Sequence, residues 1–119
     1  MIIAFANNQV MVANNSITTI IYTDPVPMGK NDRLTCHINV EYMFNSAAPG
    51  LKYVGEFSLN GSDWLPNLSV SDSVNAPVQK SLAPVISPAA FVRFRFEFTP
   101  GAAVVGAVNF DLHVDLDHS

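Results

Sequence analysis

The last third of the chain alternates strictly between apolar and polar residues. From Val92 to Thr99, and again from Val108 to Leu116, the even-numbered residues are apolar and the odd-numbered residues are polar. Successive side chains of a β-strand point to opposite faces, so each stretch predicts a strand with one apolar and one polar face. Because Pro100-Gly101 lies between them, the pattern predicts a β-hairpin over Phe91–Leu116.

The same alternation occurs earlier in the chain. One face of the stretch Arg33–Phe44 carries only apolar residues, namely Leu34, Cys36, Ile38, Val40, Tyr42 and Phe44. The pattern repeats over Leu51–Leu59, where Gly55 interrupts it and indicates a bulge. Asn60-Gly61 then predicts a tight turn before a strand that begins at Trp64. The predicted strands are Ile2–Ala6, Gln9–Ala13, Ile17–Tyr22, Arg33–Phe44, Leu51–Leu59, Trp64–Val70, Val78–Leu82, Phe91–Thr99 and Val104–Leu116.

Connections between these strands are rich in proline and small polar residues. Ser46–Gly50 is expected to link two strands, Asp24–Gly29 to form a loop, and Ala83–Ala90 to form a stiff extended connection. No helical period appears anywhere in the sequence. With 119 residues, the chain is expected to form one domain, residues 1–119, built as an all-β antiparallel sandwich of about eight strands.

Charged residues make up only 13% of the chain, against about 25% in an ordinary soluble domain. A surface this short of charge is covered either by Asn, Ser and Thr or by partner molecules. The formal net charge is −4, and the six Lys and Arg residues are scattered, which argues against nucleic-acid binding.

Targeting and redox signals are also sparse. The first residues have no basic segment and no apolar run approaches about 20 residues, so neither a signal peptide nor a membrane span is predicted, and we expect a soluble protein made without export. The sequons that begin at Asn14, Asn60 and Asn67 are then interpreted as chance. Cys36 is the only cysteine, which excludes an internal disulfide, and its apolar phase predicts a small buried side chain.

One row of polar residues contains potential metal ligands. Asp111, His113 and Asp115 fall on one face of the last strand, where carboxylate and imidazole groups could hold a divalent cation. The alternative is the solvated face of a terminal strand. Same-face residues of a strand are about 6.5 Å apart, which is wide for one coordination shell and favours the solvated face, so no metal site is predicted.

Arg93 and Arg95 share the polar face of the preceding strand. In the predicted hairpin, Arg93 would lie near Asn109 or Asp111, and Arg95 near Ala107 or Asn109. Two interpretations follow: cross-strand ion pairs of about 0.2–1 kcal/mol, or contact residues for another subunit or a partner, since arginine is enriched in interfaces.

Other candidate chemistry is weaker. His37 and Glu41 share a polar face but lie about 13 Å apart along a strand, too far for an acid–base pair. The sequence also lacks a serine in a nucleophile-elbow context, a P-loop, a dinucleotide fingerprint and a paired-cysteine motif. We therefore expect no enzymatic activity and no cofactor.

Aromatic residues offer another possibility, because Trp64, Tyr53, Tyr42 and Tyr22 could form a platform for sugar rings. Tyr42 and Tyr53 are however in the apolar phase of their strands, which favours a core or interface position. A carbohydrate- or receptor-binding module, such as a phage fibre tip or a lectin-like domain, remains the alternative function.

Five features follow one another over most of the chain: a short apolar start, the turn Ser58–Trp64, a Pro-rich link, the strand beginning Phe91-Val92-Arg93-Phe94-Arg95-Phe96, and a last alternating strand. In this order of features the chain resembles the small all-β cement (decoration) proteins of tailed-bacteriophage capsids. The resemblance implies a jelly-roll-like sandwich without active site or cofactor. It further implies a homotrimer on the capsid exterior that clamps neighbouring major capsid protein subunits, after synthesis in the host cytoplasm.

Contacts for such assembly can be assigned to particular residues. An N-terminal strand as apolar as this one should not stay solvated, so Ile2, Ile3 and Phe5 are predicted to contribute to subunit or capsid contacts, together with Arg93 and Arg95.

Overall fold

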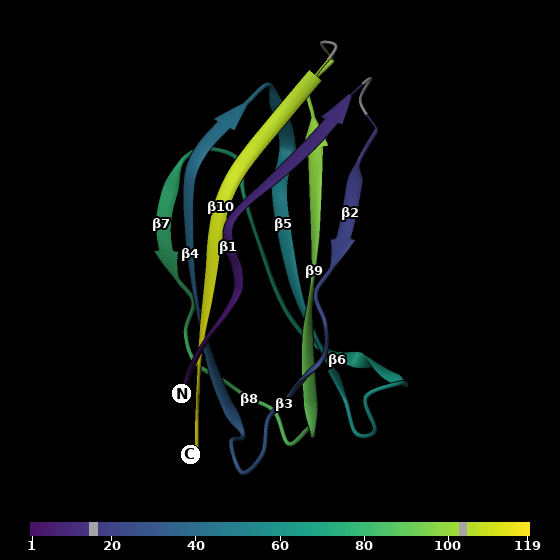
Figure 1. Ribbon diagram of the computed structural model, residues 1–119, viewed down its shortest axis with the longest axis vertical. Helices are drawn as coiled ribbons and strands as arrows, with labels where there is room; N and C mark the ends of the chain where they lie inside the picture. The colour runs from purple at the N-terminus through teal and green to yellow at the C-terminus, as the bar shows by residue number, and fades with distance from the viewer. Residues whose placement is uncertain (15–16, 103–104) are drawn as a thin grey trace.

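The computed structural model, which describes residues 1–14, 17–102 and 105–119, shows two antiparallel β-sheets packed face to face (Figure 1). The strands are β1 (Ile2–Asn14), β2 (Thr19–Tyr22), β3 (Val26–Pro27), β4 (Arg33–Phe44), β5 (Ser46–Ser58), β6 (Trp64–Val74), β7 (Val78–Ser81), β8 (Val85–Ile86), β9 (Phe91–Pro100) and β10 (Val105–Asp117). The predicted all-β sandwich is confirmed. Within the described ranges, no helix is long and apolar enough to cross a membrane.

The strand order identifies the sandwich as a jelly roll. The first sheet runs β1-β10-β4-β7 with β8 also on β4, and the second sheet runs β2-β9-β5-β6 with β3 also on β9. Among the described strands, β5 and β6 form a hairpin within one sheet, whereas the chain changes sheet between β1 and β2, β3 and β4, β4 and β5, β6 and β7, β8 and β9, and β9 and β10. This repeated crossing is the double Greek-key winding of a jelly roll.

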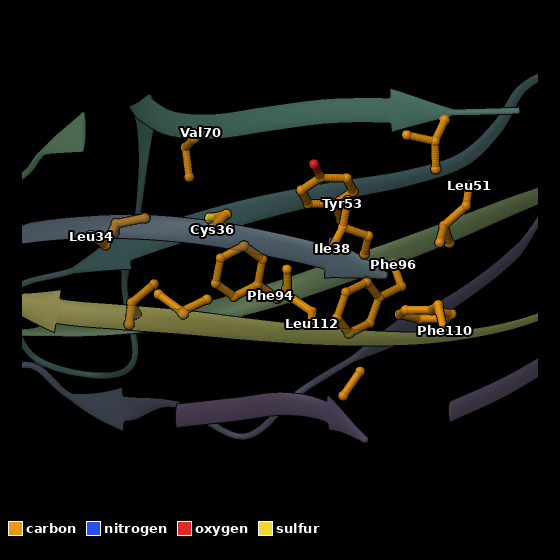
Figure 2. Packing of buried hydrophobic residues seen from close by; sticks show 14 of the residues in the cluster. Leu34, Cys36, Ile38, Leu51, Tyr53, Val70, Phe94, Phe96, Phe110 and Leu112 are labelled. Carbon is orange, nitrogen blue, oxygen red and sulfur yellow. The ribbon is translucent and has the colours of Figure 1, made fainter. Parts of the chain in front are cut away.

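The predicted hairpin over Phe91–Leu116 is wrong. β9 pairs with β2, β3 and β5 in the second sheet, whereas β10 pairs with β1 and β4 in the first. The apolar faces are nevertheless as predicted, because two strands that face each other across a core need the same alternation as two paired neighbours. Phe96 and Phe110 meet in this core with ring centroids 4.9 Å apart (Figure 2).

The core lies between the sheets and is made mainly of the inward residues of β4, β5, β9 and β10. Figure 2 shows Phe94 and Phe96 of β9 beside Ile38 of β4 and Leu112 of β10. Cys36 is 1% exposed, so the predicted buried position of this cysteine is confirmed. Burial raises the pKa of its thiol to about 12.

A β-bulge in β4 changes which side chains face the core. Val40 pairs with Phe110, but Tyr42 pairs with Asn109, so Glu41 is an extra residue in β4. After this bulge Met43 packs against the core, whereas Tyr42 and Phe44 are 54% and 53% exposed. The prediction that Tyr42 and Phe44 share the inner face of Leu34 is therefore wrong, because the extra residue reverses the alternation.

Smaller differences concern turns and boundaries. Gly55 is paired in regular register with Val70 and Phe94, so no bulge occurs there. Ser46–Gly50, predicted as a connection, belongs to β5, and the predicted Asp24–Gly29 loop and Ala83–Ala90 connection each contain a two-residue strand, β3 and β8. The tight turn predicted at Asn60-Gly61 is a longer connection, residues 59–63, in which Gly61 has the predicted positive φ, +82°, but Asn60 does not. Val104, the predicted start of the last strand, lies outside the described residues.

One side of the sandwich is closed by a polar network between the edge strands β6 and β7. The Asp72 carboxylate accepts a hydrogen bond from the Tyr53 hydroxyl (2.9 Å) and forms an ion pair with Lys80 Nζ (2.9 Å). Burial alone would raise the pKa of Asp72, but the hydrogen bonds from Lys80 and Tyr53 outweigh it and hold this pKa below its ordinary value. The network thus links the second sheet to the first.

Candidate interaction surfaces

The outer face of the first sheet carries a group of exposed apolar side chains, which we call the apolar patch. It consists of Val10 and Val12 of β1, Tyr42 and Phe44 of β4, and Val105 of β10, with the partly buried Ala107 of β10 between them. The register places Val12, Ala107 and Phe44 in one row across three strands, and Val10 and Tyr42 in the next row on either side of Asn109. Figure 1 shows that β1 and β4 end, and β10 begins, at the end of the sandwich away from the two chain termini, and the patch belongs to these parts of the strands.

The patch is well exposed and has no role in the core. Val10 and Val12 are 53% and 56% exposed, and Val105 is 42% exposed. Their inward neighbours Met11 and Val108 already fill the core. A solvated outer face normally carries polar residues, and contiguous exposed apolar groups mark interaction sites. Sequence reasoning missed this surface because the β4 bulge creates its aromatic half.

The N-terminal residues predicted as contacts divide into two groups. Ile3 and Phe5 pack against the protein's own core, and the ring centroids of Phe5 and Phe94 are 4.8 Å apart. Ile2 is 72% exposed and pairs with Asp115 of β10. Of these three predicted contact residues, Ile2 is the one whose side chain remains exposed to a partner.

Arg93 and Arg95 lie on the outer face of the second sheet, in a group we call the arginine cluster, with Glu56, Glu97, Trp64 and Tyr22. Arg93 Nε donates to Glu56 (2.9 Å), and Arg95 pairs with both Glu56 (3.3 Å) and Glu97 (3.0 Å). Burial alone would lower the pKa of Arg95, but Tyr22, Glu97 and Glu56 outweigh it and raise this pKa. The two ion pairs to Glu56 therefore hold Arg93 and Arg95 side by side on this face.

The arginine cluster corrects the predicted partners. Asn109, Asp111 and Ala107 belong to β10 in the other sheet, so neither arginine can pair with them as the hairpin predicted. The ion-pair interpretation is right in kind, with Glu56 of the adjacent β5 as the shared partner. Sequence alone did not place Glu56 beside β9, because the two strands are separated by more than 30 residues.

The proposed aromatic platform for sugar rings is not assembled. Tyr53 is 1% exposed within the core, and Tyr42 lies on the outer face of the other sheet. Trp64 and Tyr22 do lie on one face, but the guanidinium of Arg93 occupies a face of each ring, 4.0 and 4.7 Å from their centroids.

The acidic row of β10 does not form a three-ligand metal site. Asp115 Oδ1 is 3.4 Å from the N-terminal amine, and Asp111 accepts a hydrogen bond from the backbone of Asn8. In the described part of the chain, no three His, Cys, Asp or Glu side chains are placed to hold a metal ion. His37 and Glu41 are likewise apart: His37 bonds to Ser81 (2.6 Å) and Glu41 to Asn39 (2.7 Å).

Comparison with known proteins shows the fold and no family. No protein-family model and no curated protein sequence matches the chain. Among solved structures, the chain is similar to the PBSX exported protein XepA, with a TM-score of 0.63 and 13% sequence identity. The match covers 100% of this chain and 37% of the XepA chain.

Two virus structures show the same likeness. A chain in the structure of infectious bursal disease virus strain Gx has a TM-score of 0.61 at 9% identity, and one in strain Gt has 0.55 at 12% identity. Each match covers 99% of this chain, but only 32% and 31% of the virus chains. The chain therefore spans about a third of the length of the structures it resembles.

Proposed function

We propose that this chain is a structural protein of a virus particle, a decoration protein that trimerises on the capsid exterior and clamps neighbouring major capsid protein subunits. Its work would be mechanical and would use neither a catalytic residue nor a cofactor. The observation that carries the proposal is the apolar patch on the outer sheet face of a jelly roll, since the core needs none of its side chains.

The fold supports this function by precedent. Chains in two structures of infectious bursal disease virus contain a region with the same fold. The low charge content of 13% also suits a chain whose surface is largely committed to contacts.

A clamp of this kind stabilises a shell by linkage. A protein that binds the expanded lattice and not its precursor adds binding free energy to the expanded state alone. A trimer engages several capsid subunits at once, and the resulting effective concentration raises avidity without new contacts. The apolar patch is available either to a second copy or to a capsid subunit, whereas Ile2 and the arginine cluster lie on other parts of the surface.

The decisive experiment combines native mass spectrometry with co-sedimentation. The purified chain is expected to be a trimer and to sediment with expanded capsids of a tailed phage that encodes it, but not with procapsids. Phe44→Ser and Val12→Ser should weaken association or capsid binding at least tenfold. Ile20→Ser is the matched control, because Ile20 is 49% exposed on the other sheet.

The result that would overturn the proposal is a strict monomer that does not bind capsids. Saturable binding to a glycan array, lost in Trp64→Ala, would instead establish the carbohydrate-binding alternative. Ile2→Ser tests the N-terminal contact without removing a strand, whereas deletion of residues 1–6 would also remove pairing with β10.

A further inference from the structure

The polar half of the first sheet's outer face brings two histidines together. His113 of β10 and His37 of β4 are direct cross-strand partners, and both side chains lie on the solvent side of the sheet. Side chains that are direct partners in an antiparallel pair have Cβ atoms about 4.5–5.5 Å apart. Two imidazoles at this separation can hold one ion between their ring nitrogens.

The His37 ring is held in one orientation by the neighbouring strand. Its Nδ1 lies 2.6 Å from Ser81 Oγ, and Ser81 is the direct partner of His37 on β7. The two nitrogens of an imidazole point to opposite sides of the ring. Because Nδ1 faces Ser81 on β7, Nε2 points away from β7, and β10 with His113 lies on that other side of β4. Metal-binding histidines are typically oriented in this way, by a hydrogen bond at the other nitrogen.

The surroundings leave room for an ion and its water. A groove of about 280 Å³ is lined by both histidines together with Ile38, Asn39, Gln79, Lys80 and Ser81. Asp111 and Asp115 flank His113 two residues away on the same face and add negative charge about 6.5–7 Å along the strand. Lys80, whose side chain also lines the groove, has its amine paired with Asp72.

We propose that His37 and His113 form a two-histidine site for a divalent transition-metal ion of the zinc, nickel and copper group. These ions accept imidazole ligands, whereas calcium and magnesium prefer oxygen. The remaining coordination positions belong to water, since no third ligating side chain is in place among the described residues. The site is independent of the apolar patch and of the proposed capsid function.

Isothermal titration calorimetry of the full chain with ZnCl2 tests the site, after a chelator has removed any metal already bound. One zinc ion per chain is expected, and His37→Gln and His113→Gln should each weaken binding at least tenfold. His118→Gln is the matched control and should leave affinity unchanged, because His118 is bonded to Ser119 at the C-terminal end. Ser81→Ala should weaken binding about tenfold through loss of the orienting hydrogen bond.

Thermal melts should show that the outward-facing variants remain folded. In NMR spectra, zinc should shift the ring resonances of both His37 and His113 together. The proposal is overturned if either single variant binds zinc as the parent does, if His118→Gln removes the site, or if the parent binds no zinc at millimolar concentration.

Discussion

The guanidinium group of Arg93 lies over the ring of Trp64, with its central carbon 4.0 Å from the ring centroid. The same group lies 4.7 Å from the ring centroid of Tyr22 and is ion-paired with Glu56. One side chain of β9 thereby connects β2, β5 and β6 on the outside of the second sheet.

Arg93→Ala is expected to lower the free energy of unfolding by about 1–2 kcal/mol, because it removes two cation–π contacts and a partly buried ion pair. Urea unfolding followed by tryptophan fluorescence measures this, and the native emission of Trp64 should also shift. Arg93→Lys should restore part of the loss, since it keeps the charge but not the flat guanidinium. Arg33→Ala, which breaks an exposed pair with Asp117, serves as comparison and should cost less. Equal losses would contradict the argument.

Asp72 makes stability depend on pH in a definite direction. Its pKa is lowered in the folded state relative to about 3.9 in an unfolded chain, so its contribution is present above about pH 4 and is lost as the pH falls through the folded-state value. Asp72→Asn should therefore be less stable than the parent at pH 7, with the difference shrinking toward pH 3. Unfolding by urea at pH 7, 5 and 3 measures this. A difference that stays constant with pH would show that the carboxylate charge is irrelevant.

Gly55→Ala tests the packing beneath β5. A Cβ atom at this position would lie 2.7 Å from Cγ1 of Val70 and 3.1 Å from the Phe94 ring. We expect a loss of about 1–3 kcal/mol in unfolding free energy, because an overfilled core must move its neighbours. The double variant Gly55→Ala with Val70→Ala should recover part of this loss in the same denaturation assay. If Val70→Ala adds its own full cost instead, the proposed clash is wrong.

Cys36 should be unreactive in the folded protein, since it is buried and its thiol pKa is raised to about 12. Ellman's reagent at pH 8 is expected to give no colour with native protein over minutes, and one thiol per chain in guanidinium chloride. Rapid reaction of the native chain would contradict the burial of this part of β4.

Periodicity predicts most of the core, and it is wrong in β4 only beyond the bulge at Glu41. The alternation in β4, β9 and β10 assigned Leu34, Phe94 and Leu112 to the inner face, and all three are fully buried. The physical reason is local: a strand has a period of two whatever it pairs with, so one apolar residue in two predicts a half-buried sheet. The same argument predicted a two-sheet sandwich.

The candidate sites depended on long-range pairing, which alternation does not specify. The pairing of β4 with β10 places His37 beside His113, and the pairing of β5 with β9 places Glu56 beside Arg93. In both pairs the two strands are far apart in the chain. A short connection such as Pro100-Gly101 suits a hairpin, but the winding of a jelly roll sends β9 and β10 to opposite sheets.

The apolar patch shows the same division between local and tertiary causes. The sequence by itself determined that Tyr42 and Phe44 are apolar members of a strand. Only the register of β4 against β10 decided their direction, because one extra residue at Glu41 turns every later side chain to the opposite face. Local alternation therefore predicts most of the inner face of this protein, whereas the pairing of the strands decides which side chains meet on its outer surfaces.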